Sequence, residues 1–295
     1  MSILRDNINL GPREFRRIMN EEGCFAAGVF NGISAILAQQ SGFKVSYLSG
    51  SGVAANMGYP DISLTTLSEV VEEARRIIRV TRMPLIVDCD TGFGETINVS
   101  RTVRMMEEAG VSAIHLEDQI LPKRCGHLDG KELISIDDMN KKLRSASLSK
   151  KNKDFTIIAR TDSRSVEGFD ASIERAREYM NAGADAIFIE ALESESEFRE
   201  FAKKVKVPLL ANMTEFGKSP LLSFSELKSM GYAIVIYPLT AFRAMMKNVQ
   251  GIYNDLYKYG TQKNFMERLM TRRDFYDLIG YDEYGKEDSE LSKIR

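Results

Sequence analysis

The chain has 295 residues, of which 43% are hydrophobic, so it is long enough to bury a large core. Its 40 lysines and arginines nearly balance 42 aspartates and glutamates. The resulting formal charge of -2 offers no overall attraction for nucleic acid or for an anionic membrane. We therefore expect a small-molecule site, with neither nucleic acid nor a membrane as partner.

The opening segment MSILRDNINLGPREFRRIMN mixes charged and apolar residues and lacks the continuous apolar core of a secretory signal. No later segment approaches membrane-spanning length. Three cysteines, Cys24, Cys89 and Cys125, are too few and too scattered for a disulfide framework. We expect a cytoplasmic protein with free thiols.

The predicted elements alternate between strands and helices along the chain. In order, the β-rich apolar segments are CFAAGVF, KVSYLS, PLIVDCD, VSAIHLE, FTIIARTD, DAIFIE, VPLLANM and YAIVIYP. Segments with helical periodicity, such as LSEVVEEARRIIRV, separate most of them, and glycine often ends the helical pattern just before a strand. This alternation predicts a (β/α)8 barrel of the TIM type. The competing open doubly wound sheet usually has fewer strands, and neither a GxGxxG nor a GxxxxGK motif is found.

No linker rich in Pro, Gly or Ser divides the chain, so residues 1–295 are interpreted as a single barrel domain. The last part, 241–295, is predicted to be a helical extension that is amphipathic and rich in Met, Phe and Tyr. These helices either cover their own barrel or pack on a neighbouring subunit. Periodicity alone does not separate these alternatives.

Catalytic groups of barrel enzymes gather at the carboxyl ends of the strands. The polar residues that end the apolar runs here are Tyr47, Ser49, Asp88, Asp90, Glu117, Asp118, Arg160, Asp162, Glu190, Asn212 and Tyr237. Capping and turn formation do not readily place Arg160 and Glu190 after runs as apolar as FTIIA and AIFI. The pattern therefore predicts a converging acidic and cationic site.

Asp88 and Asp90 flank Cys89, and strand alternation sends both carboxylates to one side and the thiol to the other. Carboxylates that share a site repel each other unless a cation neutralises them, and Mg2+ suits such a pair. The alternative is a pair of loop carboxylates hydrogen-bonded to backbone amides. Cys89 and Cys24 are expected to be buried apolar thiols.

The segment LPKRCGHLDG places Cys125 between cationic neighbours. Lys123, Arg124 and a protonated His127 would each favour its thiolate form, so this thiol is expected to exchange a proton near neutral pH. Alternatives are an ordinary basic surface loop, a covalent cysteine nucleophile and a zinc site. The zinc site is disfavoured because the chain has only two histidines, His115 and His127, and no CxxC partner.

These residues resemble a known family. KRCGH and DCDTGFGE resemble the signatures of the isocitrate lyase and phosphoenolpyruvate mutase superfamily, and specifically those of the 2-methylisocitrate lyases. The likeness covers almost the whole chain, through YLSGSGVAANMGYPD, HLEDQILPKRCGH, IARTDSRSVEGFDASIERA, LLANMTEFGKSP and YPLTAFRAM, in that family's order and at its spacing.

The resemblance implies a (β/α)8 barrel in a homotetramer, with a C-terminal helix exchanged between paired subunits. It also implies Mg2+-dependent cleavage of a tricarboxylate, 2-methylisocitrate, into succinate and pyruvate in propionate breakdown by the methylcitrate cycle, with Mn2+ as a substitute metal. Isocitrate lyase is the nearest alternative, followed by phosphonopyruvate or oxaloacetate enzymes of the superfamily. A catalytically silent barrel that serves as a binding protein is the alternative from another class.

Within the family, a short chain, KRCGH in place of KKCGH, and Phe188 where a Trp crowds the pocket all favour the methylated substrate. Asp88 and Asp90 match the metal-site acids, while Asp61 and Glu117 match acids near the metal. Cys125 is the expected acid, with Lys123 and His127 beside it; Tyr47 is the first choice of base and Glu117 the second. The matching substrate-contacting positions are Ser49, Gly50, Ser51, Cys125, Gly126, Arg160, Glu190, Asn212, Met213, Thr214, Arg243 and Arg272. The cysteine loop and the GFGE segment are expected to close over the substrate as lids.

Overall fold

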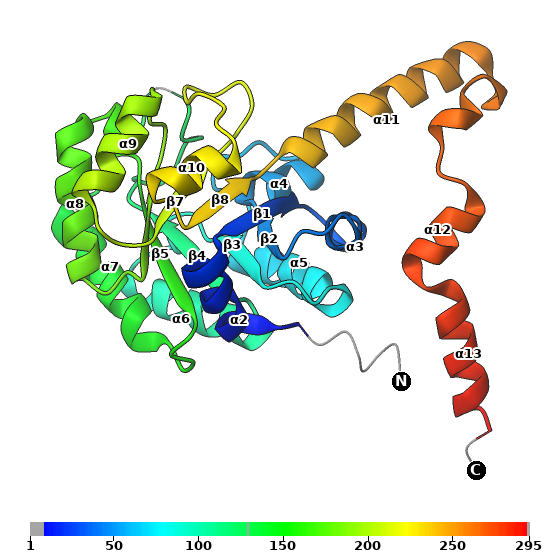
Figure 1. Ribbon diagram of the computed structural model, residues 1–295, viewed down its shortest axis with the longest axis horizontal. Coiled ribbons are helices and arrows are strands. Elements are labelled where there is room, and N and C mark those ends of the chain that lie inside the picture. Colours follow the sequence, from blue (N-terminus) through cyan, green and yellow to red (C-terminus); the bar gives the residue numbers. More distant parts are fainter. Residues whose placement is uncertain (1–8, 129, 294–295) are drawn as a thin grey trace.

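Eight parallel strands close into a barrel. The computed structural model describes residues 9–128 and 130–293. Each strand pairs with its neighbours in chain order and β8 pairs with β1, which confirms the predicted (β/α)8 fold (Figure 1). The strands are β1 Cys24–Val29, β2 Val45–Leu48, β3 Leu85–Asp88, β4 Ala113–Glu117, β5 Thr156–Thr161, β6 Ala186–Ile189, β7 Leu209–Asn212 and β8 Ile234–Tyr237.

Helices connect successive strands on the outside of the barrel (Figure 1). Where a helix meets the next strand, Gly110 and Gly231 end α6 and α10 in the left-handed conformation that the sequence pattern predicted. None of the helices described combines the length and apolar character that crossing a bilayer requires. The connecting elements are α3 Gly32–Gln40, α4 Gly50–Asn56, α5 Leu67–Val80, α6 Thr96–Ala109, α7 Ile136–Ser149, η2 Ser163–Ser165, α8 Phe169–Asn181, α9 Glu195–Lys204 and α10 Phe224–Met230.

The amino-terminal end of the barrel is plugged by α2 (Gly11–Arg17) and the π-helical turn η1 (Ile18–Glu22). Phe15 of α2 is fully buried and packs with the side chains that fill the barrel interior. Arg16 anchors this plug, because its guanidinium lies 2.7 Å from Asp185, directly before β6. With one end closed in this way, the opposite end is left for chemistry.

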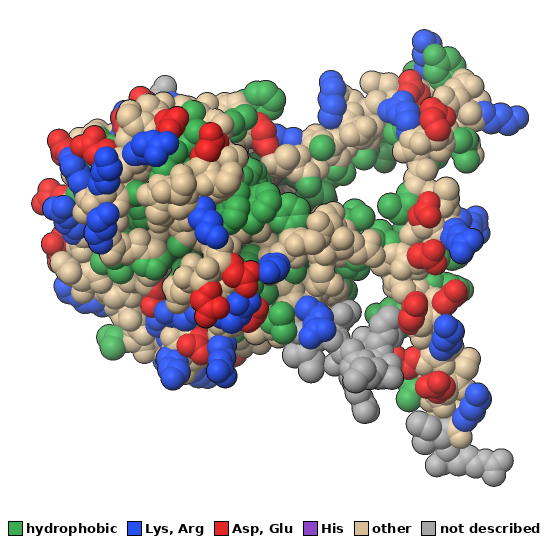
Figure 2. Space-filling model, viewed as in Figure 1, with side chains coloured by type: hydrophobic (Ala, Val, Ile, Leu, Met, Phe, Trp, Pro, Cys, Tyr) green, Lys and Arg blue, Asp and Glu red, His purple; other side chains and the backbone are tan. Residues whose placement is uncertain are grey.

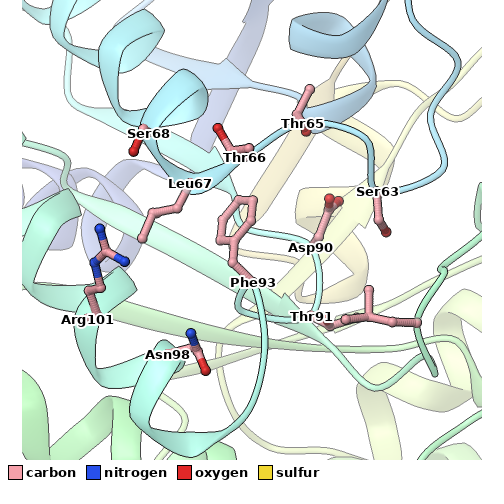
Figure 3. Close-up of a pocket in the computed structure, with 11 residues that line it drawn as sticks. Ser63, Thr65, Thr66, Leu67, Ser68, Asp90, Thr91, Phe93, Asn98 and Arg101 are labelled. Carbon is pink, nitrogen blue, oxygen red and sulfur yellow. The ribbon is translucent and has the colours of Figure 1, made fainter.

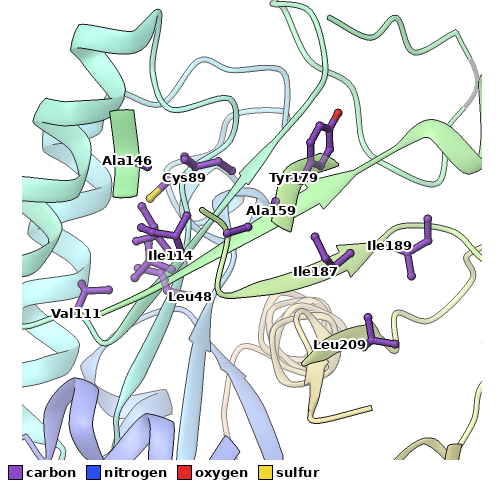
Figure 4. Close-up of a cluster of buried hydrophobic side chains, with 14 of the residues drawn as sticks. Leu48, Cys89, Val111, Ile114, Ala146, Ala159, Tyr179, Ile187, Ile189 and Leu209 are labelled. Atoms are coloured by element: carbon purple, nitrogen blue, oxygen red, sulfur yellow. The ribbon is translucent and has the colours of Figure 1, made fainter. Parts of the chain in front are cut away.

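A second cluster fills the space between the strands and the surrounding helices (Figure 4). Cys89 belongs to this outer cluster, whereas Cys24 lies in the barrel interior, and both thiols are buried and free. Burial raises the pKa of each of them. The predicted outward direction of Cys89 and the predicted burial of both thiols are confirmed.

The C-terminal extension leaves the barrel along α11 (Thr240–Tyr259), one residue before the predicted start (Figure 1). It continues through η3 (Lys263–Arg268), α12 (Arg272–Ile279) and α13 (Tyr281–Leu291). No described side chain of α12 or α13 is buried. Helix α12 contacts α3 of its own barrel, but neither α12 nor α13 buries a described side chain there.

The barrel keeps an apolar surface that the extension does not cover. Phe25 of β1 is 43% exposed and stacks on Phe224 of α10. Figure 2 shows hydrophobic side chains gathered on this side of the molecule. Several apolar side chains of the extension are exposed as well, among them Met270, Phe275 and Tyr281.

Replacing Phe15 tests the packing of α2 against the barrel interior. Phe15→Ala removes a fully buried ring, and such truncations cost about 3–5 kcal/mol, so the free energy of unfolding should fall by that amount. Urea unfolding followed by circular dichroism measures the change. Leu148→Ala is the control, because Leu148 is 87% exposed and its variant should unfold like the parent. Equal losses in the two variants would contradict the assignment.

Candidate active site

The carboxyl ends of the strands surround a cavity of about 110 Å³. Most of the predicted site residues meet there, although they come from segments far apart in the sequence. The lining residues are Tyr47, Ser49, Ser51, Asp61, Asp88, Lys123, Cys125, Gly126, His127, Arg160, Phe188, Glu190, Asn212, Thr214, Pro238, Leu239 and Arg243.

Arg160, at the end of β5, links the acids of the site. Its guanidinium lies 3.2 Å from Glu117, 2.9 Å from Asp162 and 3.3 Å from Glu190, with Phe188 stacked beneath it at 5.1 Å. Burial opposes its charge, yet these carboxylates hold the pKa of Arg160 well above its usual value. The guanidinium is therefore a fixed positive charge in the barrel mouth.

Asp88 and Asp90 lie beside this centre, as predicted, but they make different contacts. Asp88 accepts hydrogen bonds from the backbone amides of Gly50 and Asp90, each at 3.1 Å. Asp90 pairs with the ammonium of Lys123 at 3.0 Å, and the same ammonium lies 2.5 Å from Asp61. The carboxylates thus have both backbone partners and a cationic partner.

The electrostatic environment separates these acids. Burial raises the pKa of Asp90 to about 6 despite the nearby Lys123. Burial opposes the charge of Asp88 too, but Lys123 and Arg160 help to lower its pKa to about 2. Burial raises the pKa of Glu117 well above its usual value, and within the described residues neither of its carboxylate oxygens has a hydrogen-bond partner. The site holds more carboxylate than its own cations balance.

This excess of acid fits a hydrated divalent cation. Among the residues described, no three His, Cys, Asp or Glu side chains cluster in a way that could hold a metal ion directly. Mg2+ needs no such cage, because one or two carboxylates commonly hold it while water and substrate oxygens complete its shell. Asp88 and Asp90 could act as those carboxylates, and the oxygens of Glu117, which accept no hydrogen bond from the described residues, could accept hydrogen bonds from metal-bound water.

The cysteine loop is packed against the barrel mouth rather than free in solvent. Lys123 has a side chain only 3% exposed, and Cys125 lines the cavity. Gly126 lies so close to the strand ends that a Cβ there would come within 2.5 Å of Arg160 Nη2 and of Glu190. Only glycine fits this position without a clash, which explains why a glycine follows Cys125.

His127 joins the cysteine loop to two other parts of the site. Its Nδ1 accepts a hydrogen bond from the backbone amide of Lys218 at 3.0 Å. Its Nε2 lies 3.1 Å from Glu190 Oε1. His127 therefore connects the cysteine loop with the segment around Lys218 and with the end of β6.

Tyr47 has a partner that the sequence analysis did not assign to the site. Its hydroxyl lies 2.9 Å from His115 Nε2, deep in the barrel. Burial lowers the pKa of His115 to about 4, and burial together with Asp88 raises the pKa of Tyr47 well above its usual value. The protein alone therefore keeps Tyr47 protonated. Strand alternation could have identified His115, since it lies two residues before Glu117 and so faces the same way.

Three predicted substrate positions do not line the cavity: Gly50, Met213 and Arg272. Gly50 donates its backbone amide to Asp88 instead. The side chain of Met213 is buried in the outer core, and its sulfur accepts a hydrogen bond from the amide of Leu222. Arg272 begins α12 and is exposed on the extension, away from its own barrel mouth. Conversely, Pro238 and Leu239 line the cavity, and sequence reasoning missed them because it sought only polar residues at strand ends.

A larger cavity of about 350 Å³ lies beside Asp90 (Figure 3). The TGFGE segment borders it through Phe93, while Asn98 and Arg101 come from the start of α6. Asp90 lies in its wall. The GFGE segment thus lines this second space, and its role as a lid remains a prediction.

Adding one methyl group at Gly126 tests whether the cysteine loop packs against the strand ends. Gly126→Ala should displace the loop, since overpacking costs about 1–3 kcal/mol, and should speed alkylation of Cys125 by iodoacetamide roughly tenfold. Mass spectrometry of the labelled peptide measures the rate. Gly285→Ala, where an added Cβ meets no atom within 4 Å, serves as the control. An unchanged rate in Gly126→Ala would show that the loop is not held on Arg160.

Known proteins share this architecture and sequence. Residues 15–257 match the family model of phosphoenolpyruvate phosphomutase. A 2-methylisocitrate lyase of Aeropyrum pernix is 52% identical, covering 91% of this chain and 86% of the relative. The 2-methylisocitrate lyase of Escherichia coli is 44% identical, covering 92% of this chain and 93% of the relative.

Solved structures agree with the fold. A 2,3-dimethylmalate lyase superposes with a TM-score of 0.89 at 34% identity, covering 95% of each chain. An oxaloacetate acetylhydrolase bound to 3,3-difluorooxalacetate gives 0.90 at 33% identity, covering 96% of this chain and 97% of the other. The chain therefore belongs to the phosphoenolpyruvate phosphomutase family and, within it, to the 2-methylisocitrate lyases.

Proposed function

We propose that this protein is an Mg2+-dependent carbon–carbon lyase that cleaves 2-methylisocitrate into succinate and pyruvate, in the methylcitrate cycle of propionate breakdown. The observation that carries this proposal is the position of Cys125, which lines a buried cavity together with Asp88 and Arg160. The names of the relatives point to the same reaction. A scaffold protein would have no use for this set of groups.

The substrate carries three carboxylates, and the cavity offers donors for them. Arg160 and Arg243 both line it, and guanidinium groups suit bidentate binding of carboxylates. Arg243 is oriented by Glu215, whose side-chain oxygen lies 3.1 Å from its Nη1. Asn212 and Thr214 can donate neutral hydrogen bonds to the carboxylate that receives electrons during cleavage.

Asp88 and Asp90 would hold Mg2+, with Asp61 and Glu117 nearby to accept hydrogen bonds from its water. When bound, the ion supplies positive charge that lowers the pKa of the substrate hydroxyl and orients the neighbouring carboxylate. Asp88, Asp90 and Glu117 are themselves buried, so the ion would lie away from bulk water. Lys123 keeps two of these acids, Asp61 and Asp90, in position.

Cleavage requires one group to take a proton and another to give one. A base removes the proton of the tertiary hydroxyl, a carbon–oxygen double bond forms in pyruvate, and the carbon–carbon bond breaks. Its electrons pass to the future succinate, whose carbon takes a proton from the Cys125 thiol. Tyr47 is our first choice of base and Glu117 the second. His115, 2.9 Å from the Tyr47 hydroxyl, can share that proton.

We further propose a homotetramer in which the C-terminal extension packs on a paired subunit. Helices α12 and α13 have no buried side chain among the described residues, although they carry exposed Phe and Tyr rings. The exposed β1 surface around Phe25 offers a matching apolar contact. Such an exchange would bring Arg272 toward a neighbouring barrel. The free cysteines suit a cytoplasmic location.

Isocitrate is the second candidate substrate, because it differs by a single methyl group. Phe188, Pro238 and Leu239 give the cavity an apolar wall that suits the additional methyl. One methylene-sized difference is worth only about 1–3 kcal/mol, so both substrates should be cleaved to some extent. This wall favours the methylated substrate.

Turnover of the purified protein tests the proposal. With Mg2+, kcat/KM for 2-methylisocitrate should exceed that for isocitrate by roughly 10-fold to 200-fold, as expected for one methyl group in an apolar pocket. EDTA should abolish both activities. Coupled detection of pyruvate and glyoxylate measures the two reactions. Preference for isocitrate would overturn the substrate assignment, and silence with both substrates would overturn the proposed reaction.

The proton donor is tested by Cys125→Ser. Because proton transfer by a positioned group contributes about 10²–10⁴-fold, kcat should fall by about that factor, while succinate and pyruvate still bind. Steady-state kinetics and calorimetric titration with the two products provide the readouts. Cys24→Ser is the matched control, since that thiol is buried away from the cavity. Near-normal turnover in Cys125→Ser would exclude the thiol as the acid.

A further inference from the structure

Lys131, five residues beyond Gly126, is a buried lysine that the proposed mechanism does not use. Its side chain is 1% exposed, and its ammonium lies 3.0 Å from Asp162 Oδ1. The same ammonium donates a hydrogen bond to the backbone carbonyl of Gly126. A lysine is almost never buried so completely unless its charge is paired, so the ammonium of Lys131 requires these partners.

Asp162 connects this lysine to the centre of the site. Its Oδ2 accepts from Arg160 Nε at 2.9 Å, and its Oδ1 accepts from Arg160 Nη2 at 3.2 Å. Its backbone amide donates to Asp118 Oδ1 at 3.0 Å. Asp162 Oδ1 therefore joins the guanidinium of Arg160 to the ammonium of Lys131.

We propose that Lys131 is a positioning residue that holds the Cys125 loop closed and ties its closure to the orientation of Arg160. Lys131 does not line the cavity. It acts through Gly126, which does line the cavity, and through Asp162, which adjoins it. Through Gly126 it fixes the residue next to the thiol. Through Asp162 it fixes the arginine on which Gly126 is seated. This inference rests on the proposed lyase function for its effect on turnover, but not for its effect on the loop.

The closed loop has further contacts, and they define what Lys131 adds. Lys123 anchors the beginning of the loop on Asp61 and Asp90, and His127 faces Glu190 in its middle. Lys131 provides the contact at the end. When it is removed, the loop keeps its first contacts but loses the one that fixes the carbonyl of Gly126. The thiol should then be reached more easily by solvent.

Alkylation of Cys125 reports loop opening without any substrate. Cys24 and Cys89 are completely buried in the folded protein, so iodoacetamide should label Cys125 first. The rate is measured across a range of pH, and its plateau at high pH reports access rather than thiol ionisation. Lys131→Met should raise this plateau roughly tenfold, because hydrogen bonds to charged groups shift such equilibria by about that factor or more.

Lys150→Met is the matched control. Lys150 forms an ion pair with Asp185 at 2.8 Å at the opposite end of the barrel, so its loss also removes a lysine–aspartate contact. Its plateau should stay within about twofold of the parent rate, because this pair lies far from the loop. Melting temperatures of both variants show whether they are folded. If Lys131→Met does not fold, Lys131→Gln carries the test, since its side chain removes the charge and ends one atom short of the contact with Gly126, yet still offers Asp162 a neutral donor.

Turnover completes the test and separates the two proposals. If the parent cleaves 2-methylisocitrate, kcat of Lys131→Met should fall roughly tenfold, whereas kcat of Lys150→Met should not change. Alkylation that rises in Lys131→Met while the parent shows no lyase activity would support the positioning role and reject the reaction. Unchanged alkylation in both Lys131 variants would overturn the positioning role. Turnover by the parent would then support the lyase function alone.

Discussion

The charge of Arg160 is the constraint on which the rest of the site depends. A guanidinium buried at a barrel mouth needs several carboxylates, and Glu117, Asp162 and Glu190 surround it at 2.9–3.3 Å. These acids come from three successive strands, so the parallel register of the barrel is what brings them together. With Asp88 and Asp90 alongside, the site holds more negative charge than its own cations balance, and this excess supports the proposal of a divalent cation.

The cysteine loop adds further contacts to this group of charges at the strand ends. Its residues reach down to the strand ends through short contacts, and Gly126 is seated directly against Arg160. The loop therefore joins the same electrostatic network that organises the strand ends, because Lys123 pairs with Asp90 and Lys131 with Asp162. The charges that we propose to position the substrate also make the contacts that place the thiol. This sharing explains how a loop could hold a proton donor accurately.

Much of this could be predicted from the sequence. The eight apolar segments gave the barrel, and the polar residues that end them gave Asp88, Arg160 and Glu190, because parallel strands send their carboxyl ends to one place. Two features needed three-dimensional contacts. His127 accepts a hydrogen bond from the amide of Lys218, which is remote in sequence, and Lys131, which is buried, looks in the sequence like an ordinary loop lysine. The sequence also did not determine where the extension packs, since helical periodicity does not say which barrel an apolar face covers.

We propose that the acids of the strand ends hold a divalent cation together with the substrate. Calorimetric titration of Mg2+ into the protein with saturating pyruvate, compared with Asp88→Asn, tests this proposal. We expect binding in the parent and a loss of roughly tenfold or more in affinity in the variant, as found when groups that support a metal are removed. Equal affinity in the two proteins, with both folded, would show that the cation binds elsewhere.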